Sequence, residues 1–495
     1  MLPGGNTGLA LTSVLSLLLG ACTSVGPDFT EPEVQVQSNW IETDSALVDS
    51  GAALDPRWWQ VAFGDPVLNK LTEDALQKNL PLRSAGLRVL QSQQQLAIAI
   101  GSQYPQQQQI NALAQREQEN GTRISDYNLG FNLSWELDFW GRFSRQVESA
   151  SAELDASVAN FDEAMVSLVA QVAQSYLLLR TFQDRMAIAR QNIKLQEESL
   201  RIAQAKFDAG DVSELDVDQA RSLLHNTIAS VPALETSLQQ TKNALALLLG
   251  DTPQEYNKLA GTVGAIPTTT PAVALGMPQN VIRQRPDIRA AERRLAAQSA
   301  QIGFAVTELY PHFSIGGSIG TNTMETDDLF SNEGEAWNFF GSFEWNVFNY
   351  GRLESNVRLQ DALFQQLLVD YRFTVLQAQV DVENAIVAYL NSREQVKAYR
   401  VAATASQQAV DVSTAQYQNG LVDFNTVITN LNSLAQQQDV LASTRGDVAT
   451  NLVQLYRALG GGWQVRDGRN PVDLLPATMK EQMIERTDAW EGVLK

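Results

Sequence analysis

The sequence predicts a mainly α-helical chain with a membrane β part, built from two copies of one strand-and-helix unit. Residues 127–137, YNLGFNLSWEL, carry an apolar side chain at every odd position and a polar or small one between. Residues 337–347 repeat that alternation 210 positions later, and each copy leads into a long run of helix-forming residues without proline. Alternation predicts a strand, and the constant spacing predicts a duplication.

The two alternating stretches fit membrane strands. Period two places successive side chains on opposite faces. Eleven residues match the roughly 9–11 that a tilted strand needs to cross a bilayer. One apolar, aromatic-rich face and one polar face are typical of transmembrane barrels, whereas a strand of a soluble sandwich is the alternative for either copy alone. The polar positions expected to line water are Asn128, Asn132, Ser134, Glu136, Ser342, Glu344 and Asn346.

Each half contributes one hairpin. We expect strands at 106–116 and 127–138, with a turn at Asn120-Gly121 and a charged loop, and strands at 312–321 and 337–348 around an acidic loop. Four strands cannot close a barrel, and lipid does not tolerate open sheet edges. Several copies must therefore share one barrel.

The long helices predict a second tube. Residues 143–205 contain neither proline nor glycine, and about 60 helical residues extend roughly 90 Å. Such a helix needs lateral partners, and the apolar residues that follow Leu353 at three-four spacing predict a coiled coil. We expect a helical barrel coaxial with the strands, with the first returning helix interrupted at Pro232.

Two tips join the outgoing and returning helices, at 205–216 and 415–426. Gly210 and Gly420 lie 210 residues apart and suit the left-handed position that ends a helix. Ser213 is a candidate N-cap, and Asp216 makes a weak capping box with it.

The remaining segments complete a six-part division. Asp65-Pro66 predicts a capped helix start, and Arg285-Pro286-Asp287 begins a similar helix in the second half. The proline-rich linker shows no periodic element longer than one turn, and the tail reads as extended or loosely docked. The predicted parts are 1–21 (signal peptide), 22–62 (extended segment), 63–250 (first repeat), 251–278 (linker), 279–462 (second repeat) and 463–495 (tail).

The N-terminus has the features of a lipoprotein signal peptide. Residues 9–19 form an apolar run too short to span a membrane. Leu19-Gly20-Ala21-Cys22 resembles a bacterial lipobox, which predicts a covalent lipid on Cys22, with a free thiol as the alternative. Residues 1–21 contain no Lys or Arg, so the true start codon stays open.

Composition argues against several other classes. A net charge of −20 disfavours nucleic acid as a partner, and a single cysteine excludes an intrachain disulfide. The two histidines, His225 and His312, are far apart, and no nucleophile–base pair or metal-ligand cluster is evident. We expect neither catalysis, nor a metal, nor a cofactor other than the lipid.

Taken together, several motifs resemble the outer-membrane factor (TolC-like) family, in its lipoprotein efflux-channel, OprM/NodT-like branch. They are the lipobox followed by VGPDFTEP, the RPDIRAAERRL helix start, the Tyr-Pro helix ends, the Gly-Arg strand exits and the paired tip glycines, between Cys22 and Trp463. The resemblance implies a homotrimer with a twelve-stranded barrel in the outer membrane of a Gram-negative bacterium and a periplasmic helical tunnel. It also implies a periplasmic adaptor and an inner-membrane pump, with the channel as a passive conduit for small molecules.

The resemblance also places functional residues at the tips. Adaptor contacts map to Phe207, Asp208, Gly210, Tyr417, Asn419 and Gly420. The pore constriction maps to Asn425 and Thr429, where related channels often carry Leu and Asp; Asp423 is a possible acidic substitute. The cargo, the adaptor and the pump stay open. So do a non-conducting structural lipoprotein and a channel for protein secretion or metal export.

Overall fold

The computed structural model describes residues 24–42, 48–49, 54–259, 264–269 and 273–494. The expected signal peptide and Cys22 lie outside these ranges. The chain divides into two compact units, the first made of Met1–Val34, Arg88–Ala159 and Arg289–Phe373 and the second of Gln35–Leu87, Asn160–Ile288 and Thr374–Lys495.

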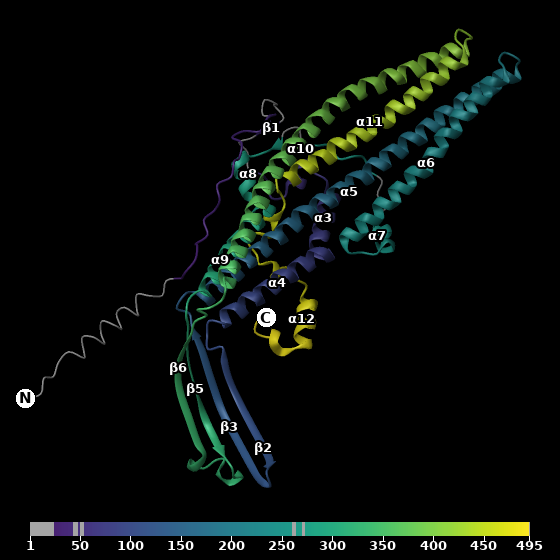
Figure 1. Cartoon of the computed structure of the whole chain (residues 1–495). Helices are drawn as coiled ribbons and strands as arrows, with labels where there is room; N and C mark the ends of the chain where they lie inside the picture. The colour runs from purple at the N-terminus through teal and green to yellow at the C-terminus, as the bar shows by residue number, and fades with distance from the viewer. Residues whose placement is uncertain (1–23, 43–47, 50–53, 260–263, 270–272, 495) are drawn as a thin grey trace, which may run out of the picture. The chain divides into compact units, whose positions relative to one another are not determined.

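The first unit contains one antiparallel sheet of four strands, in the order β2-β3-β5-β6 (Figure 1). Its strands are β2 (Gln107–Glu119), β3 (Thr122–Leu137), β5 (His312–Thr323) and β6 (Glu335–Glu344). Short 3-10 turns η1 (Thr326–Asp328) and η2 (Asn332–Gly334) lie between the last two. The two expected hairpins are confirmed, and they join into one sheet through β3 and β5.

The strand register carries each face across the whole sheet. Phe131 in β3 lies opposite Ile110 in β2 and Ile319 in β5. One residue further on, Asn132 lies opposite Ser318. Because adjacent positions face opposite sides, most apolar residues of the four strands share one face and most polar ones share the other; Leu113 in β2 and Phe340 in β6 are exceptions on the polar face.

The strand ends differ from those expected. Asn120 and Gly121 have φ of 50° and 88°, the signs of a two-residue type I′ turn, so β2 and β3 extend to the turn and leave no charged loop. β6 ends at Glu344, four residues before the expected end at 348. Within the part of the chain that the structure describes, β6 is an edge strand with a partner on one side only.

Helices make up most of the remaining described residues. α4 (Leu80–Gly101) and α9 (Pro286–Thr307) belong mostly to the first unit, and α5 (Arg142–Asp208) and α10 (Arg352–Gln418) begin there and continue in the second. The second unit also contains α2 (Trp58–Phe63), α3 (Pro66–Lys78), α6 (Glu214–Leu249), α7 (Pro253–Leu259), α8 (Pro278–Gln284), α11 (Phe424–Ala458), η3 (Trp463–Arg466), η4 (Pro471–Leu474), α12 (Ala477–Arg486), η5 (Asp488–Trp490) and the paired two-residue strands β1 (Val48–Asp49) and β4 (Val273–Ala274). Among the described residues, no helix has both the length and the hydropathy to cross a membrane.

The largest apolar core lies in the second unit and includes a helix that the sequence pattern did not reveal. In α2, the buried Trp58 stacks on Tyr456 of α11 with ring centroids 4.7 Å apart. The predicted cap of α3 is confirmed, because Asp65 accepts from the N–H of Val67 at 2.8 Å. The other carboxylate oxygen of Asp65 accepts the hydroxyl of Tyr176 at 2.6 Å, which ties the cap to α5.

Three expectations about the helical segments were wrong. α6 runs through Pro232 without a break; this residue is exposed, so water can replace the backbone bond that proline removes. The linker contains α7, a seven-residue helix. The tail is folded rather than loose: Arg466 forms a buried ion pair with Asp162 at 2.8 Å, and Leu475 and Met483 are buried.

Candidate functional site

The sheet has the two faces of a pore wall. On its apolar face, large side chains such as Phe339 and Phe343 are exposed in the single chain. On its polar face, amides bond across the strands: Asn132 Nδ2 donates to Asn111 Oδ1 at 2.8 Å. An exposed aromatic face opposite a face of polar amides suits a wall between lipid and water.

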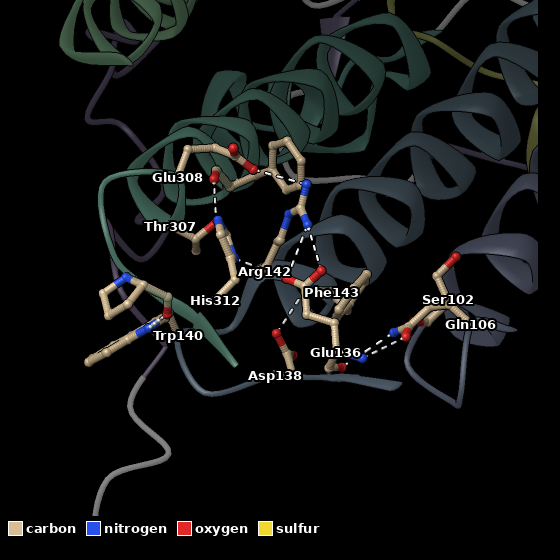
Figure 2. A network of polar contacts seen from close by, with 12 residues as sticks. Ser102, Gln106, Glu136, Asp138, Trp140, Arg142, Phe143, Thr307, Glu308 and His312 are labelled. Carbon is tan, nitrogen blue, oxygen red and sulfur yellow. Dashed lines mark hydrogen bonds and ion pairs between the residues drawn. The ribbon is translucent and has the colours of Figure 1, made fainter. Parts of the chain in front are cut away.

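A charged network lies where the sheet meets the helices of the first unit (Figure 2). Arg142, the first residue of α5, contacts both carboxylate oxygens of Glu136 at 3.0–3.1 Å and Glu308 at 3.0 Å. Nδ1 of His312 lies 3.0 Å from Glu136. The network connects the end of β3, the start of β5, the start of α5 and Glu308, the residue just after α9, so it holds the strand ends against the helix ends. His312 therefore has a structural contact here, which its position in the sequence did not predict.

The start of α5 is fixed by two further contacts at the same junction (Figure 2). Asp138 accepts the backbone N–H groups of Phe143 and Ser144, each at 2.9 Å. Trp140 Nε1 donates to the carbonyl of Pro311 at 2.8 Å, and its ring stacks on Tyr310 at 4.7 Å. These contacts leave the backbone little freedom between strand and helix.

The segment just after Cys22 is held against this junction. Val25 donates its N–H to the carbonyl of Trp140 at 3.0 Å. Arg145, whose side chain is buried, donates to the Val25 carbonyl at 3.1 Å and pairs with Asp28 at 3.0 Å. Gly26 has φ of 91°, and a Cβ there would overlap the backbone of Gly303. We call the contacts of residues 24–28 the N-terminal clamp; no sequence signal predicted it.

The two helical tips share one backbone design. At the first tip, Gly210 has φ of 80° and donates to the carbonyl of Phe207 at 2.9 Å. At the second tip, Gly420 has φ of 73° and donates to the carbonyl of Tyr417 at 3.0 Å. Both glycines therefore take the left-handed position that ends a helix, as expected.

Tyr417 joins the tips to each other. Its side chain is only 4% exposed and packs on Phe424 with ring centroids 4.9 Å apart. Its hydroxyl lies 3.3 Å from Asp216 at the start of α6, and the Lys206 ammonium lies 5.4 Å from its ring centroid. Burial raises the pKa of Tyr417 to about 12, and the nearby Asp216 carboxylate adds to this. We call these four residues the tip clasp. A side chain buried in this way is not available for direct contact with an adaptor.

The other expected contact residues are accessible at the tips. Phe207 is 38% exposed, and Asp208, Asn419, Gly210 and Gly420 are exposed as well. The Asn419 side chain donates to the carbonyl of Ala415 at 2.7 Å, which orients it within the helix end. These residues form a surface that a partner can reach.

The expected constriction residues lie on the first turns of α11. Asp423 caps this helix: its Oδ1 accepts the N–H of Thr426 at 2.9 Å and the hydroxyl at 2.8 Å, and these bonds lower the pKa of Asp423. Asn425 and Thr429 are exposed and one turn apart, and the Thr429 hydroxyl donates to the Asn425 carbonyl at 2.8 Å. The buried Phe424 begins the opposite face of the helix.

Part of the tip differs from its sequence prediction. Ser213 occupies the N-cap position of α6, but its side chain makes no capping bond. Asp216, expected to complete a capping box with it, instead accepts from Tyr417. Over the ranges that the structure describes, no group of three or more His, Cys, Asp and Glu side chains is arranged to hold a metal ion.

A two-faced sheet with open edges, joined to long helices with capped and clasped tips, defines a class of outer-membrane channel. The chain belongs to the outer membrane efflux protein family, which matches residues 71–251 and 277–461. The protein is therefore an outer-membrane efflux channel subunit, a component of tripartite efflux systems, and the family consists of channels rather than enzymes.

Individual relatives agree over almost the whole chain. It is similar to nodulation protein T of Rhizobium leguminosarum bv. trifolii, with 29% identity over 91% of this chain and 97% of the relative. It is 31% identical to outer membrane protein OprJ of Pseudomonas aeruginosa over 93% of this chain and 96% of the relative. The solved structure of the outer-membrane channel OprN superposes with a TM-score of 0.84, at 32% identity, over 89% of this chain and all of that one. The expected fold class, a helical chain with four strands in a shared barrel, is confirmed.

Proposed function

We propose that three copies of this chain form a passive conduit through the outer membrane, which receives small molecules from an inner-membrane pump through a periplasmic adaptor. The observation that supports this most is the four-stranded sheet, whose apolar and polar faces are continuous across all strands. Among the described residues, neither edge strand has an outer partner, and lipid tolerates only closed barrels. Three copies supply twelve strands.

A paired charge insertion tests the assignment of the two faces. Phe131→Arg places a cation on the apolar face and should reduce the free energy of membrane assembly by roughly 2–4 kcal/mol. Asn132→Arg, one residue away on the polar face, is the matched control; it should assemble normally and shift ion selectivity. Planar-bilayer conductance and the yield of detergent-stable oligomer measure both effects. Equal assembly of the two variants would show that Phe131 does not face lipid.

The tips support a role as gate and docking surface. We propose that the tip clasp keeps the conduit closed, and that an adaptor binds the exposed residues Phe207, Asp208 and Asn419 beside Gly210 and Gly420. Binding there would separate the tips, and the energy for transport would come from the pump. In this proposal Tyr417 holds the two tips together and does not contact the adaptor.

Photo-crosslinking in cells tests the docking surface. A photo-reactive residue at position 419 should capture a periplasmic adaptor, identified by mass spectrometry. The same probe at Val401, which is 70% exposed on α10 but lies before the tip, is the control and should capture it less. Capture at 401 and not at 419, with both proteins expressed, would move the docking surface away from the tip.

We propose that Cys22 carries a covalent lipid and that the chain needs no other cofactor and catalyses no reaction. The N-terminal clamp supports the lipid, because it holds Val25, three residues after Cys22, beside the end of the membrane sheet. Mass spectrometry of the N-terminal peptide should show acyl chains on Cys22 and none in Cys22→Ser. An unmodified thiol in the mature protein would contradict the proposal.

The cargo stays open between small molecules, metal ions and proteins. Efflux assays in a strain that lacks the gene would identify it. A chain that assembles in the membrane but gives no conductance would instead favour a structural lipoprotein.

A further inference from the structure

A cavity in the second unit is lined by residues outside the sheet, the strand–helix junction and the tips. Its volume is about 340 Å³, at the lower end of the range of about 300–1,000 Å³ that is typical of small-molecule sites. Helices α2, α3 and α5 line it together with the first residues of α4 and the folded tail at η3 and η4. The tail thus forms one wall of the cavity, and the helices of the same unit form the others.

Positive charge is concentrated on the wall of this cavity, although the chain as a whole has a net charge of −20. The wall contains four arginines, Arg57, Arg83, Arg466 and Arg469. Among the described residues of the wall, Glu73 is the only acidic one. The buried ion pair with Asp162 neutralises Arg466. The other three guanidinium groups, like Glu73, form no ion pair within the described part of the chain, so the wall carries an excess of positive charge.

Two N–H donors on the same wall are buried without an acceptor. Trp59 is 2% exposed, and within the described ranges its Nε1 has no hydrogen-bond partner. The same holds for Nε of Arg83, whose Nη2 donates to the carbonyl of Gln77 at 3.1 Å. A buried donor without an acceptor destabilises the fold. An acceptor group bound in the cavity would therefore stabilise it, and an ionised carboxylate offers two acceptor oxygens.

The rest of the wall is largely apolar and more deeply buried than the arginines. Its buried apolar members are Leu82, Phe161, Met165 and Leu475. Arg57 and Arg469, in contrast, are exposed. A bare anion would leave the apolar wall without a partner, and a neutral apolar molecule would leave the donors unpaired. An anion that carries an apolar body satisfies both parts of the wall.

We propose that this cavity binds a small organic carboxylate with an apolar body. Its head group accepts hydrogen bonds from Arg83 and Arg469, because a guanidinium group can bind a carboxylate through two parallel N–H donors. Its body packs on Phe161 and Met165, whose ring and thioether suit an aromatic ligand. Since η3 and η4 form one wall, the bound ligand holds the tail against the helices. The inference goes beyond the proposed conduit and does not depend on it.

Isothermal titration calorimetry of the full-length protein in nanodiscs tests the site, with nanodiscs that lack protein as the blank. Cinnamate carries a carboxylate on an aromatic body and should bind saturably, at one site per chain. Cinnamyl alcohol keeps the body without the charge, acetate keeps the head group without the body, and each should bind several-fold more weakly. Equal binding of acetate would overturn the role of the apolar wall, and equal binding of the alcohol would overturn the role of the arginines.

Substitutions on the wall test whether cinnamate binds in this cavity. Arg83→Gln and Arg469→Gln each remove a guanidinium group from the wall and should weaken cinnamate binding several-fold. Arg486→Gln removes an exposed arginine of α12 outside the cavity, and this matched control should bind as the wild type does. Leu474→Trp places a ring at a position that is 37% exposed, so it should fill part of the cavity without disturbing the core. Wild-type affinity in the three cavity variants would move the cinnamate site elsewhere and overturn the inference.

Hydrogen exchange gives a second readout, on the tail itself. Saturating cinnamate should slow amide exchange across residues 465–475 in the wild-type protein and in Arg486→Gln, but not in Leu474→Trp. Exchange at the two tips should stay the same and serves as the internal reference. Unchanged exchange in the tail, or no saturable binding to the assembled protein, would overturn the inference. Either result would leave the proposed conduit intact, because conductance and adaptor capture test it separately.

Discussion

The two tips began as copies of one sequence and now perform different tasks. Both keep a left-handed glycine and the same backbone bonds around it. At the position three residues before that glycine, however, Phe207 is partly exposed while Tyr417 is buried. The duplication has preserved the turn and changed the side chain beside it, so the conformation of the turn does not require one particular aromatic contact.

The N-cap residues of α6 and α11 also differ between the two tips. At the second tip, Asp423 occupies the cap position and bonds Thr426 three residues later. At the first tip, Ser213 occupies the cap position without a capping bond, and the acidic residue lies three residues later, as Asp216. That carboxylate is therefore available to accept from Tyr417. The first tip supplies the acceptor, Asp216, and the second tip supplies the donor, Tyr417, so this hydrogen bond requires both tips.

The largest expected difference between the tips comes from truncating these two aromatic residues. Tyr417→Ala removes a buried ring and should destabilise the tip bundle by about 3–5 kcal/mol, whereas Phe207→Ala at the matching position should cost about 1 kcal/mol or less. The first variant should leave the conduit open, which bilayer conductance and sensitivity to a large antibiotic would measure. The second should stay closed and lose adaptor capture. Equal effects of the two substitutions on closure would show that the tips are not specialised.

Substitution of the glycines tests what the tips still share. Gly420→Val and Gly210→Val each place a β-branched side chain in a left-handed conformation, at a cost of about 1–2 kcal/mol. A Cβ would meet no atom within 4 Å at either site, so backbone strain is the main effect. Both variants should weaken efflux to a similar extent at normal expression. Unaltered efflux in one of them would show that its turn has no role in coupling.

The hydroxyl of Tyr417 gives a smaller and pH-dependent effect. Tyr417→Phe keeps the ring and removes one hydrogen bond, which should destabilise the closed tip by about 1 kcal/mol. The pKa of Tyr417 is raised to about 12 from an ordinary value of about 10. The closed state thus holds this proton more tightly, so the clasp is complete below about pH 10 and weakens as the pH rises toward 12.

Recordings at pH 9 and pH 11 would measure this dependence. The open probability of the wild-type channel should rise between these values. The open probability of Tyr417→Phe should change less, because the variant has no phenol to ionise. An equal change in both proteins would assign the effect to another group.

The sequence was informative where a repeated pattern constrained the backbone. Alternation predicted the four strands, and the spacing of the tip glycines predicted both turns. Contacts between distant positions left no periodic signal: the tip clasp joins residues 201 positions apart, and the N-terminal clamp joins Asp28 to Arg145. The predicted interruption at Pro232 was wrong because the low helix propensity of proline does not indicate whether the residue lies on the exposed side of its helix. Asp216 has the right type and spacing for a capping box, and only tertiary packing gave it another partner.

The smallest effect concerns Asp423, which has two possible roles. As a helix cap it needs only an acceptor, so Asp423→Asn and Asp423→Ser should keep α11 intact, whereas Asp423→Ala should expose the Thr426 amide to hydrogen exchange. As an acidic gate it needs its charge, so Asp423→Asn alone should reduce the preference for cations, measured from reversal potentials. Its pKa is lowered, so any capping contribution persists above the ordinary aspartate pKa of about 3.9 and disappears only as the pH falls through the lower folded-state value. Asp423→Asn keeps the hydrogen-bond acceptor of the cap and removes the charge. This one substitution therefore decides whether Asp423 serves only as a helix cap or also as a gating charge.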